Sequence, residues 1–280
     1  LKIIDHGIWG MCGDGDLMEG ISHEAASLAG HLKLSKLVFF YDDNQITIDG
    51  STSISCSDDV ARRFEAYGWQ VLTILDVNDS DQVERAINLA RTSADKPTII
   101  ISKSHIGFGS PNKQDKSSAH GAPLGEEEVK LTKRNFGLPE DKTFYVHDEV
   151  YSHFKGIGEC GQEAEDLWNA TLDQYKEKYP KDYALFVSLI NREYNNDWLH
   201  HLPKFEDYNE KISTRVVSGK VLNAAAIDIP ALIGGSADLN ESNMTHIKSS
   251  TSFSLANRKG KNIHFGIREH AMGAVLNGMA

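Results

Sequence analysis

The chain of 280 residues is long enough for one large domain or two ordinary ones, and its 40% hydrophobic and 25% charged residues are typical of a folded globular protein. Its 40 acidic and 29 basic residues give a formal charge of −11, which argues against nucleic acid as a partner, and no apolar run is long enough for a membrane span. The odd, widely spaced cysteines Cys12, Cys56 and Cys160 form no metal-binding motif and suit a reducing compartment, so we expect a cytoplasmic protein.

The first hundred residues alternate between short apolar runs, typical of strands, and stretches with helical periodicity. In one of these stretches Ile21, Ala25, Leu28 and Leu32 lie on a single helical stripe. This alternation favours an α/β fold, a parallel sheet flanked by helices. The expected strands are Ile8–Cys12, Leu37–Tyr41, Trp69–Leu75 and Pro97–Ser102, and the expected helices are Gly20–Leu32, Asp58–Tyr67, the latter with acidic residues in its first turn, and Ser80–Thr92.

Beyond the sheet, Ile106–Gly125 is rich in Gly, Ser, Lys and Pro, and a loop of this length in a compact domain is usually functional or disordered. Glu126–Glu128 is expected to open a solvated helix. Residues 148–195 have a helical pattern that is polar on one side. The candidate packing residues of that stretch are Trp168, Leu172, Tyr175 and Phe186.

The irregular, aromatic stretch Asn195–Lys211 resembles a linker, so we expect a first domain at 1–196 and the linker with the beginning of a second α/β domain at 197–280. In the second domain the pattern predicts a helix at Arg215–Ile227, a strand at Ala231–Gly234 and a helix at Glu269–Met279.

Two short motifs follow neighbouring predicted strands. Gly13-Asp14-Gly15 ends the first strand, where glycines allow a tight turn and close approach to a bulky anion, and its carboxylate can bind a hard cation. Asn44 follows the second strand, and its amide oxygen with a backbone carbonyl beyond it could complete an oxygen site for magnesium together with phosphate oxygens. An isolated Gly-Asp-Gly is more often an ordinary turn, but the pair lies where open α/β sheets bind ligands.

The sequence segments around these motifs resemble those of the transketolase family, whose members use thiamine diphosphate. They occur in the family's order over nearly the whole chain. The matching segments are Gly13–Glu24, Ser27–Leu34, Phe64–Trp69, Ile106–Ser110, His120–Gly125, Gly234–Leu239 and Gly266–Gly273.

The resemblance implies a metal site and a cofactor site in the first domain. Asp14, Asn44 and the backbone carbonyl of Ile46 would bind Mg²⁺, or Ca²⁺ or another divalent cation, which anchors the diphosphate of thiamine diphosphate. Gly15 and Asn44 would contact the diphosphate itself. Ile48 and Ile106 would line the apolar slot for the cofactor, although core packing is an almost equal interpretation of both side chains.

The resemblance also assigns roles in the reaction. His120 would contact both the diphosphate and the substrate beside the reacting carbon, whereas His105 is interpreted as structural. Arg215 and Ser242 would bind the sugar phosphate. Asp238 would support the cofactor pocket or the subunit interface. Glu269 would be the catalytic glutamate. It would hydrogen-bond a ring nitrogen of the aminopyrimidine so that the thiazolium ylid forms.

The implied activity is transfer of a two-carbon ketol unit from a ketose phosphate to an aldose phosphate in the pentose phosphate pathway, by a homodimer with active sites at its interface. The sequence begins without a Met or a signal peptide, so we expect it to start within a longer protein. The resemblance implies an internal fragment that lacks an N-terminal part and most of the C-terminal half, and we expect this fragment to be inactive alone. The chain departs from the family's usual pattern at Gln114–Ser118 and at Val216, after Arg215.

Two alternatives stay open. Dihydroxyacetone synthase has a sister activity that uses formaldehyde as acceptor. A transketolase-like protein that only binds a partner or a nucleotide is the alternative from another class. The second is disfavoured because Asp14, Asn44, His120 and Glu269 are all present, whereas a pseudoenzyme is expected to have lost at least one of them.

Overall fold

The computed structural model describes residues 1–193, 196–205 and 211–280. The chain forms two compact units, residues 1–172 and 173–280, and each is described by itself below. The expected linker Asn195–Lys211 falls partly outside the described residues, and the domain boundary after residue 196 stays a prediction.

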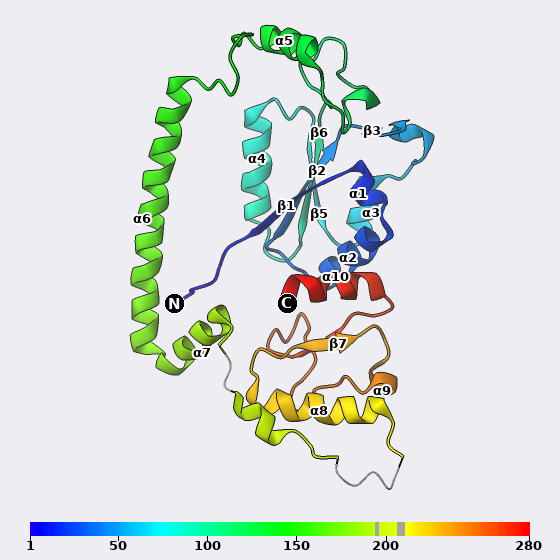
Figure 1. Cartoon of the computed structure of the whole chain (residues 1–280), viewed down its shortest axis with the longest axis vertical. Coiled ribbons are helices and arrows are strands. Elements are labelled where there is room, and N and C mark those ends of the chain that lie inside the picture. Colours follow the sequence, from blue (N-terminus) through cyan, green and yellow to red (C-terminus); the bar gives the residue numbers. More distant parts are fainter. Residues whose placement is uncertain (194–195, 206–210) are drawn as a thin grey trace. The chain divides into compact units, whose positions relative to one another are not determined.

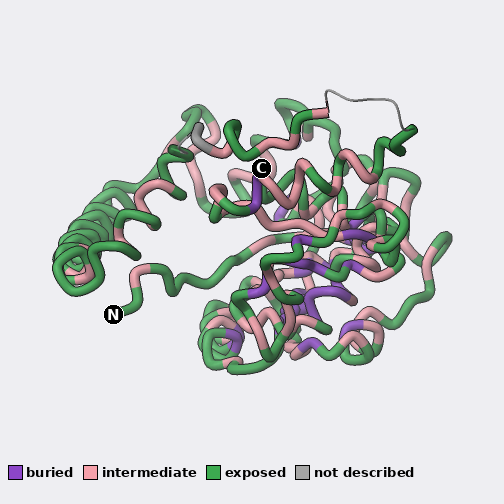
Figure 2. The backbone as a smooth tube through the Cα atoms, turned by 90° about the horizontal axis from the view of Figure 1, so that it is seen from below, coloured by how far each residue is buried: buried purple, intermediate pink, exposed green. Residues whose placement is uncertain are grey.

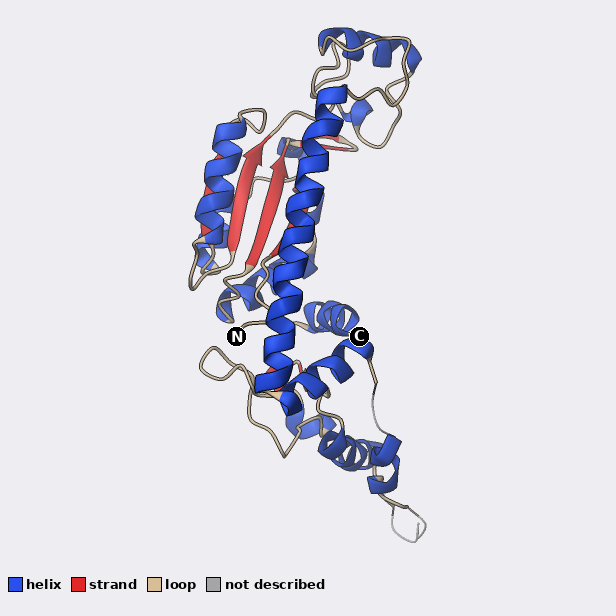
Figure 3. Ribbon diagram, turned by 90° about the vertical axis from the view of Figure 1, so that its left-hand side faces the viewer, coloured by secondary structure: helices blue, strands red, loops and turns tan. Residues whose placement is uncertain are grey.

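The first unit is built on a four-stranded parallel sheet with the strand order β1-β2-β6-β5 (Figures 1 and 3). The register aligns Cys12 with Tyr41 and Tyr41 with Ile101, so the three strands on that side of the sheet end close together. All four expected strands are present, and the predicted α/β fold with a parallel sheet is confirmed. Their bounds are β1 (Ile8–Gly13), β2 (Leu37–Asp43), β5 (Gln70–Ile74) and β6 (Thr98–Lys103).

Helices cover both faces of this sheet. Helices α2 (Gly20–His31) and α3 (Val60–Ala66) pack on one face, where Ala26 and Phe64 belong to the same buried cluster as the sheet residue Ile99. Helix α4 (Ser80–Arg91) packs Ala86 and Ala90 on the other face, against Val38, Ile74 and Ile100. The buried residues, purple in Figure 2, gather in the sheet and in the helices packed on it, so this sheet is the main core of the unit.

Two details of these helices differ from the expectation. In α2 the predicted stripe is rotated, because Ala25 is exposed while Ala26 and Ala29 are buried beside Leu28. In the second helix the acidic residues precede the first turn, since α3 begins at Val60 and the carboxylate of Asp59 caps it by accepting a hydrogen bond from the Arg62 amide at 3.0 Å.

The rest of the first unit consists of loops, helices and the short antiparallel strand pair β3 and β4. The expected helical stretch at 148–195 contains two helices, and of its candidate packing residues Trp168 is exposed while Leu172, Tyr175 and Phe186 are partly buried. The Trp168 indole Nε1–H donates to the carbonyl oxygen of Ile3 at 2.9 Å and so ties the first residues of the chain to α6. The remaining elements are α1 (Asp14–Met18), β3 (Ile46–Thr47), β4 (Gly50–Ser51), η1 (Thr52–Ile54), η2 (Ser117–Ala119), α5 (Glu126–Asn135), α6 (Asp148–Lys178) and, in the second unit, α7 (Pro180–Asn191).

The second unit is a smaller α/β element around the parallel pair of β7 and β8. The expected strand Ala231–Gly234 is displaced toward the C-terminus, whereas the helix at Glu269–Met279 has the predicted bounds. Among the described residues no helix is both long and apolar enough to cross a membrane. The elements of this part are η3 (Asn196–His201), α8 (Thr214–Asp228), β7 (Gly234–Ser236), α9 (Asn240–Asn243), β8 (Asn262–His264) and α10 (Glu269–Met279).

Candidate functional site

A cavity of about 1080 Å³ lies beyond the carboxyl ends of β1, β2 and β6. The Gly-Asp-Gly turn, the segment after β2 and both ends of the loop between β6 and α5 line its wall. The cavity therefore unites the residues to which the sequence assigned the metal and the cofactor in the first unit: Asp14, Gly15, Asn44, Ile46, Ile48, Ile106 and His120.

Asp14 is the most enclosed acidic group of this wall, with 9% of its surface exposed. Its Oδ1 accepts a hydrogen bond from the Tyr41 hydroxyl at 2.6 Å, and its Oδ2 accepts one from the backbone N–H of Gln45 at 3.1 Å. Burial raises the pKa of the Asp14 carboxyl above its ordinary value, the Tyr41 hydrogen bond acts against this rise, and the nearby charge of Asp43 adds to it. The carboxylate is held in place in an environment with surplus negative charge.

Asn44 is fixed from two sides. Its Oδ1 accepts from the backbone N–H of Ile46 at 3.0 Å, and its Nδ2 donates to Asp42 Oδ2 at 3.0 Å. The other oxygen of Asp42 accepts a hydrogen bond from the Ser104 hydroxyl at the end of β6. The amide nitrogen of Asn44 is only a donor, whereas its amide oxygen has two lone pairs and accepts one hydrogen bond, from Ile46, so this oxygen is the atom of Asn44 that can bind a cation.

The backbone of the cavity wall is open where the sequence placed glycines. A Cβ atom at Gly15 or Gly121 would meet no other atom within 4 Å, so bulky groups can approach the main chain there. On the same wall Ile48 exposes 74% of its surface, and Ile106 is partly buried. For Ile48 this exposure argues against core packing and suits an apolar contact with a ligand.

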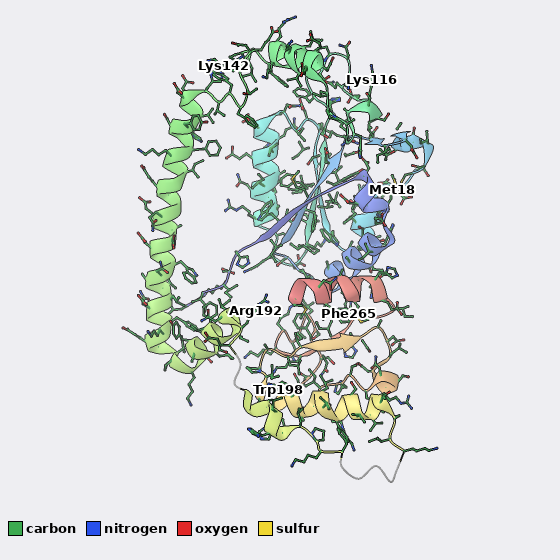
Figure 4. The ribbon with its side chains drawn as sticks, in the orientation of Figure 1. Met18, Lys116, Lys142, Arg192, Trp198 and Phe265 are labelled. Carbon is green, nitrogen blue, oxygen red and sulfur yellow. The ribbon has the colours of Figure 1, made fainter. Side chains whose placement is uncertain are left out.

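His120 follows η2 at the far end of the loop that leaves β6, and Lys116, labelled in Figure 4, marks the residues just before η2. The His120 side chain is exposed at the cavity wall. His105 also lines the cavity, but its Nδ1 is paired at 2.8 Å with Asp115 Oδ1 across the same loop, which agrees with the structural role expected for it.

The site residues predicted in the second unit are exposed. Arg215, near the start of α8, donates from Nη1 to the backbone carbonyl of Ser242 at 3.2 Å, so these two positions are neighbours as the shared phosphate role requires. Asp238 follows β7 in a left-handed conformation with φ of 61°. Glu269 is the first residue of α10 and is exposed, whereas the role implied for it needs a partly buried carboxyl group.

Sequence reasoning missed three side chains that shape this site. Tyr41 was interpreted only as the last apolar residue of a strand, although its hydroxyl holds Asp14. Asp42 and Ser104 orient Asn44. The spacing of these residues could have indicated their contacts. Asp42 and Asn44 are two residues apart at the end of β2, and Ser104 directly follows the neighbouring strand β6.

The donor set suits a divalent cation bound jointly by protein and phosphate. Asp14 Oδ2, Asn44 Oδ1 and the Ile46 carbonyl are hard oxygen donors, and magnesium usually takes few protein ligands together with phosphate oxygens. In the described part of the chain no group of three or more His, Cys, Asp or Glu side chains is arranged to hold a metal, so a metal bound by protein side chains of those types alone is not indicated there. Burial first, and then the nearby charge of Asp43, raises the pKa of the Asp14 carboxyl, and a bound cation would favour its ionised form.

The fold and the cavity together define an α/β protein with a candidate ligand site at the carboxyl ends of parallel strands. The sequence profile described as "Transketolase, thiamine diphosphate binding domain" matches residues 1–195, and the profile described as "Transketolase, pyrimidine binding domain" matches residues 210–280. The chain therefore belongs to the transketolase family.

Individual relatives agree with this assignment. The chain is 48% identical over 280 residues to a transketolase of Bacillus subtilis (strain 168) and 46% identical to one of Geobacillus stearothermophilus, and it covers all of its own length but 42% of each of theirs. A crystal structure of a Pichia stipitis transketolase in complex with sedoheptulose-7-phosphate superimposes with a TM-score of 0.95 at 37% identity, over 99% of this chain and 42% of that one. The chain thus spans less than half of the relatives that it matches.

Proposed function

We propose that this chain is the part of a transketolase that binds the diphosphate of thiamine diphosphate and a divalent cation, and that the longer protein transfers two-carbon ketol units between sugar phosphates. The observation that carries the proposal is the single cavity where Asp14, Asn44 and His120 meet, although 30 residues separate the first two and 76 the last two (44 − 14 and 120 − 44). The family membership and the sugar phosphate in the Pichia stipitis structure support the same activity.

In this proposal Mg²⁺, or another divalent ion such as Ca²⁺, is bound by Asp14, the amide oxygen of Asn44 and the carbonyl of Ile46. Tyr41 and the Gln45 amide hold the carboxylate of Asp14. The ion screens the diphosphate from the acidic surroundings of the site. This is necessary because the pocket itself contributes carboxylates rather than an excess of cationic side chains.

The cofactor contacts divide between polar and apolar walls. The backbone at Gly15 would lie against the diphosphate, and Ile48 and Ile106 would flank the rings of the cofactor. When bound, thiamine diphosphate supplies the carbon nucleophile that accepts and releases the ketol unit. The protein contributes position, charge and exclusion of water.

The substrate is handled by residues of both units. His120 would donate hydrogen bonds to the diphosphate and to oxygen atoms of the sugar, where they would stabilise developing negative charge. The guanidinium of Arg215 and the hydroxyl of Ser242 bind the phosphate of the sugar, for which the planar donor fork of arginine is suited. Asp238 would support the cofactor pocket or the subunit interface.

Glu269 would hydrogen-bond a ring nitrogen of the aminopyrimidine of the cofactor and favour its imino form. Glu269 is exposed in this structure, so the enclosed environment needed for this role has to be supplied in the assembled enzyme. A second copy of the protein provides that environment in this proposal, so the working unit is a homodimer. We place its activity in the cytoplasm and in the pentose phosphate pathway.

The binding half of the proposal is tested by isothermal titration of thiamine diphosphate into the chain, with and without Mg²⁺. Asp14→Ala should abolish the magnesium-dependent binding. The matched control is Asp49→Ala, because Asp49 lines the same cavity and has no assigned role. Equal losses in both variants, or binding that needs neither the ion nor Asp14, would contradict the assigned metal site.

The catalytic half is tested on the full-length protein with a ketose phosphate donor. Transfer to an aldose phosphate supports the proposal. Transfer to formaldehyde alone would instead indicate a dihydroxyacetone synthase, and cofactor binding without transfer to either acceptor would indicate a binding protein.

A further inference from the structure

The first turn of α5, which follows the loop from β6, contains an acidic group that the proposed reaction does not use. The sequence predicts a solvated Glu126–Glu128 at the start of α5, and for Glu128 this is wrong, because its side chain is buried with 9% of its surface exposed. The neighbouring Glu127 has a side chain that is 85% exposed and pairs only locally with Lys130. Two adjacent glutamates of one helix therefore have different environments.

The Glu128 carboxylate accepts three hydrogen bonds from the loop. Its Oε1 accepts from the Ser110 hydroxyl at 2.5 Å and from the Asn112 backbone N–H at 2.8 Å, and its Oε2 accepts from Asn112 Nδ2 at 2.9 Å. Ser110 is itself only 2% exposed. Both carboxylate oxygens are thus occupied by residues that are 16 and 18 positions earlier in the chain.

The turn held by Glu128 is closed on itself by further hydrogen bonds. Besides donating to Glu128, the Ser110 hydroxyl accepts from the Lys113 backbone N–H at 3.2 Å. The Asp115 N–H donates to the Ile106 carbonyl at 3.0 Å, which returns the chain to the point where the loop left β6. A Cβ at Gly107 would lie 3.1 Å from the Cβ of Ala119, so the two arms of the loop touch next to the cavity.

The other end of α5 holds the same loop. Asn135 Nδ2 donates to the Gly109 carbonyl at 3.0 Å, and the ring of Phe136 lies over Gly109, where a Cβ would come within 2.3 Å of it. Helix α5 therefore contacts the loop through both of its termini. The two arms that it holds together carry Ile106 and His120 to the cavity wall.

We propose that Glu128 is a positioning residue, which anchors the turn at Ser110–Asn112 and thereby fixes Ile106 and His120 at the cavity. The importance of this position for catalysis rests on the proposed function, but the anchoring itself does not. The hydrogen bonds from Ser110 and then Asn112 lower the pKa of the Glu128 carboxyl, so the ionised form that accepts all three hydrogen bonds is the one that the folded loop favours.

The test compares Glu128→Ala and Ser110→Ala with Glu127→Ala. The control removes the same charge from the same first helical turn, so it corrects for any effect on α5 itself. Two readouts that need no cofactor are measured on the whole chain. The first is hydrogen exchange of the amides of residues 110–115, among which Pro111 has no N–H. The second is the ring resonances of His120 in a carbon–proton NMR spectrum, assigned with a His120→Gln variant.

Glu128→Ala and Ser110→Ala should speed the exchange of these amides by on the order of tenfold or more, because each loses a hydrogen bond to a buried charged group. They should also shift or split the His120 signals, while the amides of β2 and β6 stay protected. Glu127→Ala should leave both readouts unchanged. Glu128→Gln, which keeps one acceptor oxygen, should give an intermediate effect on both readouts. If the alanine variants do not fold, this variant tests the proposal on the same two readouts.

Unchanged exchange and unchanged His120 signals in Glu128→Ala would overturn the proposal, and so would an equal effect in Glu127→Ala. Failure of the wild-type chain to bind thiamine diphosphate would count against the proposed function, but it would not alter either readout. With cofactor binding present, a double-mutant cycle adds a second check. Glu128→Ala should weaken binding less in a His120→Ala background than in the wild type, because the anchor acts through His120.

Discussion

The hydroxyl of Tyr41 lies 2.6 Å from Oδ1 of Asp14 and joins the end of β2 to the turn that follows β1. Both side chains are buried, and the same hydroxyl lies 3.5 Å from Asp43. Tyr41, which the sequence indicated only as a core residue of the strand, thus also holds the carboxylate of Asp14, which is assigned to the metal.

Replacing this hydroxyl tests its contribution. Tyr41→Phe should lower the free energy of unfolding by about 1.5–3 kcal/mol, the usual contribution of a hydrogen bond to a charged group. It should also weaken magnesium-dependent binding of thiamine diphosphate. Urea denaturation measures the first effect, and a parallel Asp14→Asn, Tyr41→Phe double variant should show that the two losses are not additive. Additive losses would mean that the two side chains act independently.

The core of the first unit depends on β6, whose residues Ile99 and Ile100 are fully buried and face opposite sides of the sheet. Ile100→Ala should lower the free energy of unfolding by about 2–5 kcal/mol, because it leaves a cavity between the sheet and α4. Leu75→Ala is the control, since Leu75 is 74% exposed and should change the same quantity by less than about 0.5 kcal/mol. Similar losses from both changes would contradict the assigned core.

Two glycines in helices have opposite predicted sensitivity. A Cβ at Gly30 in α2 would lie 1.8 Å from the Tyr67 carbonyl oxygen, so Gly30→Ala forces α2 away from the end of α3 and should cost about 1–3 kcal/mol. Gly156 in α6 has open space at the same position. Gly156→Ala should therefore stabilise that helix by about 0.5–1 kcal/mol. Thermal denaturation of the two variants should shift the midpoint in opposite directions, and a shared direction would show that the close approach at Gly30 is relieved elsewhere.

The loop anchor should depend on pH. Because the folded loop lowers the pKa of Glu128 below its ordinary value of 4.5, its stabilising effect is complete above that value and is lost as the pH falls through the lowered pKa. Exchange of the amides of residues 110–115, corrected for its intrinsic pH dependence, should accelerate below about pH 4.5. The same acceleration in Glu128→Gln would assign it to another group.

Much of the fold could be predicted because its signals are local. Apolar runs such as Leu37–Tyr41 form strands covered on both faces, and the carboxyl ends of parallel strands meet at one edge, which is why Asp14 and Asn44 converge. The rotation of α2 that buries Ala26 instead of Ala25 depends on how the helix lies on a twisted sheet, and short-range periodicity does not contain that information.

The polar contacts were harder to foresee for the same reason. Glu128 has the same local sequence context as Glu126 and Glu127, and only its partners 16 and 18 residues away distinguish it. Ser104 and Asp42 are paired because β2 and β6 are neighbours in the sheet, although β5 separates them in the chain. The exposure of Glu269 in this chain likewise follows from tertiary surroundings, whereas its position at the start of α10 was predictable.

The hydrogen bond from Trp168 to the carbonyl of Ile3 gives the chain an intrinsic optical probe. Trp168 is 41% exposed, whereas Trp69 is buried and donates from its indole to the Ala26 carbonyl at 2.8 Å. Detachment of the first residues would change the emission of Trp168 and leave that of Trp69 unaltered. Fluorescence of single-tryptophan variants can therefore follow docking of the amino-terminal segment separately from unfolding of the sheet, without any added dye.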